Sequence, residues 1–214
     1  ERQYVWLSEA RHPLLGEAVP ISVKIGDQWP VLLVTGPNAG GKTVALKTVG
    51  LLILMAQAGL HVPAKEATLT VFDGVYVDIG DQQSIERSLS TFSFHIQNLR
   101  AVMEQATERS LVLVDELGTS TEPEEGTALA KAILQYLCRR GTSLMATSHH
   151  REVSSFVQDQ PGMMNASVEL DPQTLAPTYR LTLGLPGRSY AIAIASRLGL
   201  AREIIDNAQA LRPA

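Results

Sequence analysis

The sequence lacks the features that mark secreted, membrane-spanning and nucleic-acid-coating proteins. Its 214 residues include a single cysteine, Cys138, so no internal disulfide can form. No charged segment followed by an apolar stretch opens the chain, and the most apolar run, at residues 49–56, is too short to span a bilayer. The net charge is −4, from 18 basic and 22 acidic residues, which provides no basic surface for a nucleic-acid backbone. We therefore expect a cytoplasmic protein without a membrane partner, and we expect any DNA contact to come from other domains.

Length and composition favour one folded unit. With 45% hydrophobic residues, 214 residues suffice to bury one sizeable core. We expect a single domain over residues 1–214, made of an N-terminal β subregion (1–30), a phosphate-loop core (31–184) and a C-terminal helix pair (185–214). Because the sequence has no initiator methionine and stops just after a helical pattern, we expect it to be part of a longer protein.

Short apolar runs rich in β-branched residues alternate with longer helical patterns. This alternation is typical of an α/β fold with a largely parallel sheet. The main predicted elements are strands at 31–35, 75–78, 111–115 and 143–147, with helices at 42–58, from about 90 to 103, and from 122 to 140. The last of these helices has Thr121 as its predicted N-cap, Pro123 in its first turn, Glu124 three residues after the cap and Gly141 beyond its end.

The two ends of the chain have a different pattern. Four short runs are punctuated by proline, glycine or aspartate and predict an antiparallel side sheet: residues 4–7, 21–25, 167–170 and 179–183. Residues 189–198 and 201–211 predict two short C-terminal helices.

A glycine-rich loop at residues 36–43 is the most specific motif. It fits the pattern G-x-x-x-x-G-K-[ST], follows a predicted strand and opens a predicted helix. The N–H groups of such a loop surround phosphates, and the helix N-terminus adds partial positive charge. Lys42 would place a full charge near the β and γ phosphates, and the Thr43 hydroxyl could bind Mg²⁺. The predicted ATP-binding residues are Gly36, Pro37, Asn38, Ala39, Gly40, Gly41, Lys42 and Thr43.

An acidic pair, Asp115 and Glu116, follows the apolar strand predicted at 111–115. Ligands bind at the carboxyl ends of strands in α/β sheets, so Asp115 should hold magnesium there. Glu116 can polarise a water in line with the γ-phosphate. Two acids at a strand end could merely cap it, but beside a phosphate loop they predict ATP hydrolysis.

Two histidines follow the strand predicted at 143–147. One imidazole, of His149 or His150, could reach the γ-phosphate side of the site. A histidine at a strand end is otherwise a hydrogen-bonded structural group, so this motif gains weight only beside the other two.

The order of these motifs resembles the MutS family. No N-K-x-D segment for reading guanine is present, which disfavours a GTPase, and ATPase dimers of the ABC type fit better. The segments that match MutS ATPase domains are Arg11-His12-Pro13, residues 36–43, residues 59–64, Ser90-Thr91-Phe92, residues 115–121 and Thr147-Ser148-His149. Those most similar to the second-type bacterial paralogue, the anti-recombination branch, are residues 40–48, 79–85, Pro123-Glu124-Glu125-Gly126 and 186–189.

The resemblance implies a fold and roles for individual residues. It implies a P-loop NTPase of the ABC-ATPase type, with ATP or ADP and Mg²⁺ as cofactors, which dimerises through its ATPase face. Ser90 and Asn38 would act across the dimer interface, and His149 would be the switch histidine, although His150 remains the alternative. Tyr179 lies near the position of an adenine-contacting residue, and core packing is its alternative role.

Three functions remain to be compared. The first is an ATP-hydrolysing motor that drives DNA-binding arms in recombination control or DNA repair, with branched or junction DNA bound by domains outside this chain. The second is a nucleotide-dependent dimerisation module with negligible turnover, which could serve quality control at the ribosome. The third, a nuclease, is disfavoured because the sequence has no clustered histidine and carboxylate site besides the one assigned to Mg-ATP.

Overall fold

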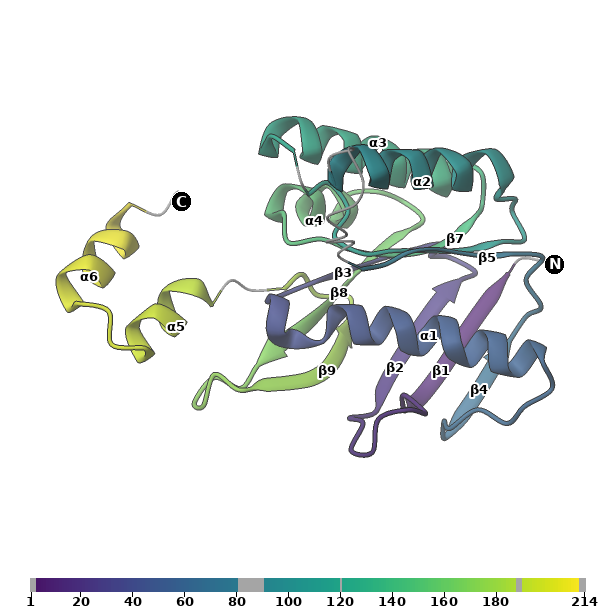
Figure 1. The fold of residues 1–214 in the computed structure, drawn as a ribbon, viewed down its shortest axis with the longest axis horizontal. Helices are drawn as coiled ribbons and strands as arrows, with labels where there is room; N and C mark the ends of the chain where they lie inside the picture. The colour runs from purple at the N-terminus through teal and green to yellow at the C-terminus, as the bar shows by residue number, and fades with distance from the viewer. Residues whose placement is uncertain (1–2, 81–90, 120, 188–189, 212–214) are drawn as a thin grey trace.

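The computed structural model describes residues 3–80, 91–119, 121–187 and 190–211. In these ranges, six strands form a central sheet in the order β5-β6-β7-β3-β8-β9 (Figure 1). Their bounds are β3 Val31–Thr35, β5 Val75–Asp78, β6 Leu111–Val114, β7 Ser143–Thr147, β8 Met163–Leu170 and β9 Pro177–Leu183. Neighbouring strands run parallel except β8 and β9, which are antiparallel. The predicted α/β fold with a mainly parallel sheet is confirmed.

The central strands follow the predicted ranges closely. β3, β5 and β7 have the predicted bounds, and β6 ends one residue before the predicted end at 115. Every residue of β3, β6 and β7 is buried, as expected for parallel strands with both faces covered. Asp115 therefore lies in the turn after β6, at the carboxyl edge of the sheet.

Helices cover both faces of this sheet (Figure 1). The helices of the core are α1 Lys42–Gln57, α2 Thr91–Gln105, α3 Pro123–Arg139 and α4 Arg151–Gln158. Helix α1 packs on one face together with the side sheet, and α2, α3 and α4 lie on the other. The side chains divide into two clusters accordingly, one containing Leu46 and Leu52 of α1 and the other Leu134 and Leu137 of α3.

The antiparallel side sheet exists but has other members than predicted. In the described part of the chain it contains three strands in the order β2-β1-β4: β1 Tyr4–Ala10, β2 Ile21–Gly26 and β4 Glu66–Leu69. Strand β4 was not predicted. The runs predicted at 167–170 and 179–183 belong instead to β8 and β9 of the central sheet, because β8 pairs in parallel with the full length of β3. Composition alone could not reveal this long-range pairing.

The N-terminus of α3 differs from the prediction. Its N-cap is Glu122, not Thr121, and no side-chain hydrogen bond caps it. Pro123 is the first helical residue, where the fixed φ of proline suits the helix and its missing N–H leaves no unsatisfied donor. The proline therefore fixes the start of the helix, so the predicted capping box does not form.

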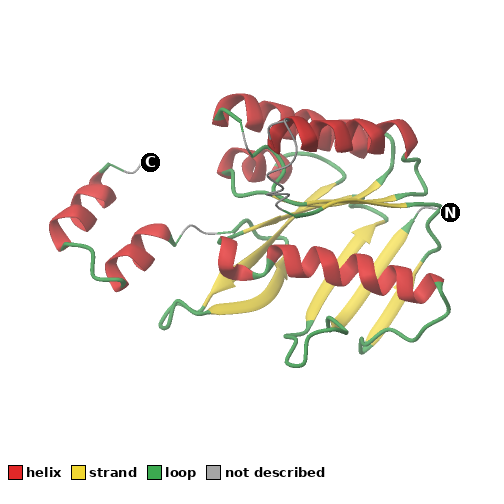
Figure 2. Ribbon diagram, viewed as in Figure 1, coloured by secondary structure: helices red, strands yellow, loops and turns green. Residues whose placement is uncertain are grey.

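Two short helices end the described chain, α5 (Ala191–Arg197) and α6 (Arg202–Ala210). Both lie within the predicted ranges and are shorter than predicted. They pack against each other and lie to one side of the two sheets, as the secondary-structure colouring in Figure 2 shows.

One helical stretch of the described chain, Asn38–Gln57, is long and apolar enough to cross a membrane by length and composition alone. This stretch contains the apolar run at residues 49–56 and helix α1, which is one residue shorter than the helix predicted at 42–58. Half of its most apolar window is buried inside the protein, where it packs against the central sheet. A core helix of this kind passes the same test as a membrane span, so the finding is weak evidence for a membrane.

We expect Gly126→Ala to destabilise the protein. Gly126 packs on the turn after β6, where an added Cβ would lie 2.1 Å from the carbonyl oxygen of Gly118. Relieving that overlap should lower the free energy of unfolding by about 1–3 kcal/mol, which urea denaturation can measure. Gly16→Ala is the matched control, because a Cβ there meets no atom within 4 Å. Equal stability of the two variants would contradict this packing.

Candidate functional site

The predicted phosphate loop joins the end of β3 to the start of α1. A 3-10 turn, η1 (Asn38–Gly40), lies between them, and Gly41 has a φ of 90°, in the left-handed region that favours glycine. Gly41 is also the N-cap of α1. Because glycine has no side chain, no side-chain oxygen caps the first N–H groups of α1. Gly36 needs its small size, because an added Cβ would lie 2.2 Å from the carbonyl oxygen of Val168 in β8.

Lys42 closes this loop on itself. Its ammonium donates hydrogen bonds to the carbonyl oxygen of Gly36 at 2.8 Å and to Oδ1 of Asn38 at 3.2 Å. The side chain is buried, and the pKa of Lys42 lies below its ordinary value. Burial, which lowers this pKa, outweighs the negative charges of Glu116 and Asp115, which raise it. The lysine and both acids therefore lie close enough to interact electrostatically.

Thr43 and Asp115 meet at the carboxyl edge of the sheet. The Thr43 hydroxyl donates to Oδ2 of Asp115 at 2.6 Å, although the two residues are 72 positions apart in sequence. A hydroxyl and a carboxylate oxygen are hard ligands of the kind that Mg²⁺ prefers, so this pair fits the cation assigned to it from sequence. Asp115 is buried, and a buried carboxylate needs such partners.

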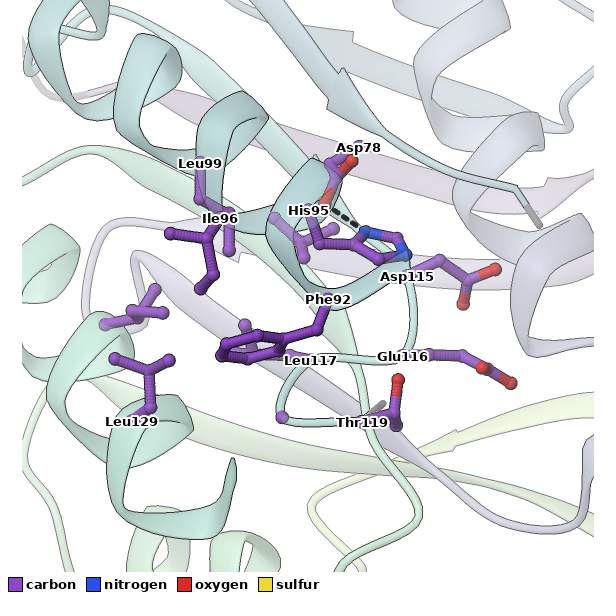
Figure 3. Close-up of a pocket in the computed structure, with 13 residues that line it drawn as sticks. Asp78, Phe92, His95, Ile96, Leu99, Asp115, Glu116, Leu117, Thr119 and Leu129 are labelled. Atoms are coloured by element: carbon purple, nitrogen blue, oxygen red, sulfur yellow. Dashed lines mark hydrogen bonds and ion pairs between the residues drawn. The ribbon is translucent and has the colours of Figure 1, made fainter. Parts of the chain in front are cut away.

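Glu116 has a strained backbone. Its φ is 52°, in the left-handed region that glutamate rarely adopts. Its N–H donates to Oγ1 of Thr147 at 2.8 Å, which holds the turn in this conformation. Figure 3 shows the carboxylates of Asp115 and Glu116 pointing in the same direction, away from Phe92 and Leu129. Such strain costs on the order of 1–3 kcal/mol and is common at functional sites.

A pocket beside this pair contains residues that the sequence analysis did not select. It lies between the start of α2 and the turn after β6, with an apolar wall that includes Phe92 and Leu129 (Figure 3). On its polar side the buried carboxylate of Asp78 binds Nδ1 of His95 at 2.8 Å and Nδ2 of Asn98 at 3.0 Å. The three-residue spacing of His95 and Asn98 on a helix was a usable signal, but their partner at the end of β5 was not visible in the sequence.

The two histidines after β7 differ in their surroundings. His149 lies at the surface with part of its side chain covered, and the centroid of its ring is 4.5 Å from that of His150. Partial burial lowers the pKa of His149, and His150 and Lys42 also lower it, while Glu116 raises it. Nε2 of His150 is buried and has no hydrogen-bond partner among the described residues. His149 is thus the histidine with an electrostatic link to the loop and the acidic pair.

The remaining predicted residues lie around the loop or outside the described chain. Tyr179 of β9 has its ring against the loop, since a Cβ added to Gly41 would lie 2.8 Å from Cδ1 of the tyrosine. Pro37 is partly buried, and Asn38 and Ala39 are exposed. Ser90 falls outside the described residues.

Comparison with known proteins gives the family. The family model for MutS domain V matches residues 32–213. The chain belongs to the MutS family. It is similar to proteins called Endonuclease MutS2, with 52% identity to that of Brevibacillus brevis over 98% of this chain and 27% of the relative. Identity to the proteins of Halalkalibacterium halodurans and Thermomicrobium roseum is 54% and 55%, over 98% and 97% of this chain and 27% and 26% of the relatives.

This MutS-family chain therefore spans about a quarter of the length of the relatives it matches. The resemblance inferred from the motifs is confirmed, because the relatives carry the name of the second MutS paralogue. The family supports the assignment as a MutS ATPase domain.

We expect His149 of this MutS-family chain to titrate below its ordinary pKa of about 6.5, because partial burial and His150 disfavour the charged ring. The imidazole is then neutral at pH 7. The unfolded chain binds this proton more tightly, so the stability contributed by His149 is present above pH 6.5 and is lost as the pH falls below it. An NMR titration of the imidazole signals, assigned with His149→Gln, measures the midpoint. A midpoint above about 6.5 would contradict the electrostatic surroundings described here.

Proposed function

We propose that this chain binds ATP with Mg²⁺ and hydrolyses it as the motor domain of a MutS-like protein, with the fold of an ABC-type P-loop NTPase. The observation that carries the proposal is the hydrogen bond of 2.6 Å between Thr43 and Asp115. It joins the residue after the loop lysine to the first residue of the acidic pair. The two motifs are independent of each other in sequence. ATP hydrolysis needs both at the same place, because one would bind the phosphates and the other would bind Mg²⁺ and activate water.

The loop residues would bind the triphosphate. N–H groups at the start of α1, together with those of residues 36–43, can donate to phosphate oxygens. Lys42 is already satisfied by Gly36 and Asn38, so a phosphate would replace two neutral acceptors with charged ones, which form stronger hydrogen bonds. Thr43 and Asp115 would hold Mg²⁺, which neutralises negative charge on the phosphates when it is bound.

Glu116 would act as the general base. The strained turn holds its carboxylate beside Asp115 and within electrostatic range of Lys42. From there it can orient a water molecule and accept its proton as the water attacks the γ-phosphate. His149 would contact the γ-phosphate side of the site, since Glu116 and Lys42 both influence its pKa. Tyr179, against Gly41, is available for stacking on the adenine.

The partners of the whole protein are also proposals. We infer a homodimer with nucleotide between its ATPase faces, in which Asn38 and Ser90 act across the interface. Asn38 is exposed, as that role requires. DNA, as branched or junction forms, would be bound by domains outside this chain, in recombination control or repair. The endonuclease activity in the name of the relatives is said of proteins about four times as long, and this proposal concerns the nucleotide step alone.

Glu116→Gln should leave ATP and Mg²⁺ bound while lowering kcat by about 10²-fold or more, because the amide cannot accept the proton. Lys42→Ala should instead weaken ATP binding itself. Equilibrium binding of a fluorescent ATP analogue and phosphate release, measured on both variants, separate the two effects. Unchanged turnover in Glu116→Gln would refute the assignment of the base. Negligible turnover of the wild type despite tight ATP binding would favour a dimerisation module, with ATP at its interface and a role such as ribosome quality control.

Hydrolysis should depend on dimer formation. Specific activity should rise with protein concentration, as mass action requires if each site needs residues from two subunits. Mixing Ser90→Ala protein with Lys42→Ala protein should partly restore activity, because a mixed dimer contains one site with both functional residues. Subunit exchange is verified with tagged chains. Mixtures that exchange subunits and yet show only the summed activity of the two variants would exclude a role for Ser90 across the interface.

A further inference from the structure

We propose that Thr147 is a positioning residue for hydrolysis, whose side-chain hydroxyl holds Asp115 and Glu116 in their working orientation. This inference rests on the proposed ATP hydrolysis. From sequence, Thr147 lies at the end of a predicted strand and in a segment that resembles MutS ATPase domains, but no role follows for its side chain. Nothing in the glycine loop or the acidic pair requires it. The proposal follows from where the strand ends and from the two hydrogen bonds of one hydroxyl.

Strand β7 places Thr147 between the two halves of the site. It lies between β6, which leads into the acidic pair, and β3, which leads into the phosphate loop. Thr147 is the last residue of β7 and is opposite Val34 of β3 in the register. It is fully buried. Because threonine is β-branched, its χ1 is restricted, so the strand fixes the position of the hydroxyl.

The hydroxyl of Thr147 contacts both acids at once. It donates to Oδ1 of Asp115 at 2.5 Å and accepts the N–H of Glu116 at 2.8 Å. Thr43 already donates to Oδ2 of the same aspartate. Each carboxylate oxygen of Asp115 therefore accepts a hydrogen bond from a different hydroxyl, which restricts rotation of the carboxylate.

The main chain of the same strand end reinforces this connection. The carbonyl oxygen of Thr147 accepts the N–H of Leu117 at 2.8 Å, and the Ser148 hydroxyl donates to the carbonyl oxygen of Leu117 at 3.1 Å. The turn that holds Glu116 at a φ of 52° is thus bound to β7 on both sides of the glutamate. His149 follows two residues after Thr147, so the same strand end connects the histidine to the acids.

The partner of the Thr147 hydroxyl differs from those of two other buried threonines, Thr142 and Thr48. The Thr142 hydroxyl donates to the main-chain carbonyl oxygen of Thr107 at 2.9 Å, and the Thr48 hydroxyl donates to that of Val44 at 2.7 Å. Thr147 donates to a carboxylate that is a candidate metal ligand. Residues that orient a ligand in this way typically contribute 10–100-fold in metal affinity or activity.

The test uses Thr147→Val, which keeps the shape of the side chain and removes the hydroxyl. In the full-length protein we expect kcat to fall about 10–100-fold, with a much smaller change in the KM for ATP, because the phosphate loop is intact. The Mg²⁺ concentration that gives half of the maximal ATP-analogue affinity should rise about tenfold. Thr147→Ser retains the hydroxyl and should restore most of both properties.

Thr142→Val is the matched control, because it removes a buried hydroxyl just before the other end of β7. Its melting temperature should fall about as much as that of Thr147→Val, while kcat and the Mg²⁺ requirement stay near wild type.

If Thr147→Val does not fold, Thr147→Ala is compared with Thr142→Ala in the same assays. Equal losses of kcat at positions 142 and 147 would overturn this inference, and so would wild-type kcat and Mg²⁺ dependence in Thr147→Val. Either result would leave the proposed ATP hydrolysis unaffected. A wild-type protein that neither binds nor hydrolyses Mg-ATP would overturn the proposed function and the inference with it.

Discussion

The site is organised around the buried carboxylate of Asp115. A carboxylate at this depth is costly unless hydrogen bonds replace the water it has lost. Thr43 from the start of α1 and Thr147 from the end of β7 provide these bonds, one for each oxygen. The requirement to satisfy one acid therefore brings together three segments that are far apart in sequence, and it fixes the distance between the phosphate loop and the acidic pair before any nucleotide is bound.

The chemistry of the loop follows from a second constraint, the close contact between strands β3 and β8. Val168 of β8 lies against Gly36 and Gly40, so a larger residue at either position would collide with it. With β8 on one side and β7 on the other, β3 has no freedom to shift sideways. The proposed phosphate-binding N–H groups are therefore supported by the most buried part of the sheet.

Much of this architecture could be predicted from sequence. The strands β3 and β7 were predicted with their observed bounds because parallel strands with both faces covered are continuous runs of buried residues, which stand out from helical periodicity. The bounds of β5 were also predicted, although it is an edge strand and only Asp78 is buried in it. The phosphate loop and the acidic pair were predicted because their chemistry requires particular residues at fixed spacing. Whether the predicted residues bind ATP and Mg²⁺ remains a prediction.

The errors and omissions share a physical cause. The pairing of β8 with β3, the existence of β4, and the bonds of Asp78 with His95 and Asn98 all join residues far apart in sequence. Local composition carries no information about such partners. The cap of α3 was wrong for a different reason, since two local signals competed and proline at the first helical position prevailed over the capping box.

The alternation of side chains along β3 has a further consequence for how this chain can change over evolution. Leu32 and Val34 belong to the cluster under α1, whereas Val31 and Leu33 belong to the cluster under α3. A single-residue insertion or deletion inside β3 would exchange these two sets of side chains between faces and would shift Gly36 relative to Val168. Loops before the strand can absorb changes in length, but the strand itself cannot. The packing therefore constrains the spacing from Val31 to Thr43 as one unit, from the hydrophobic core to the phosphate loop.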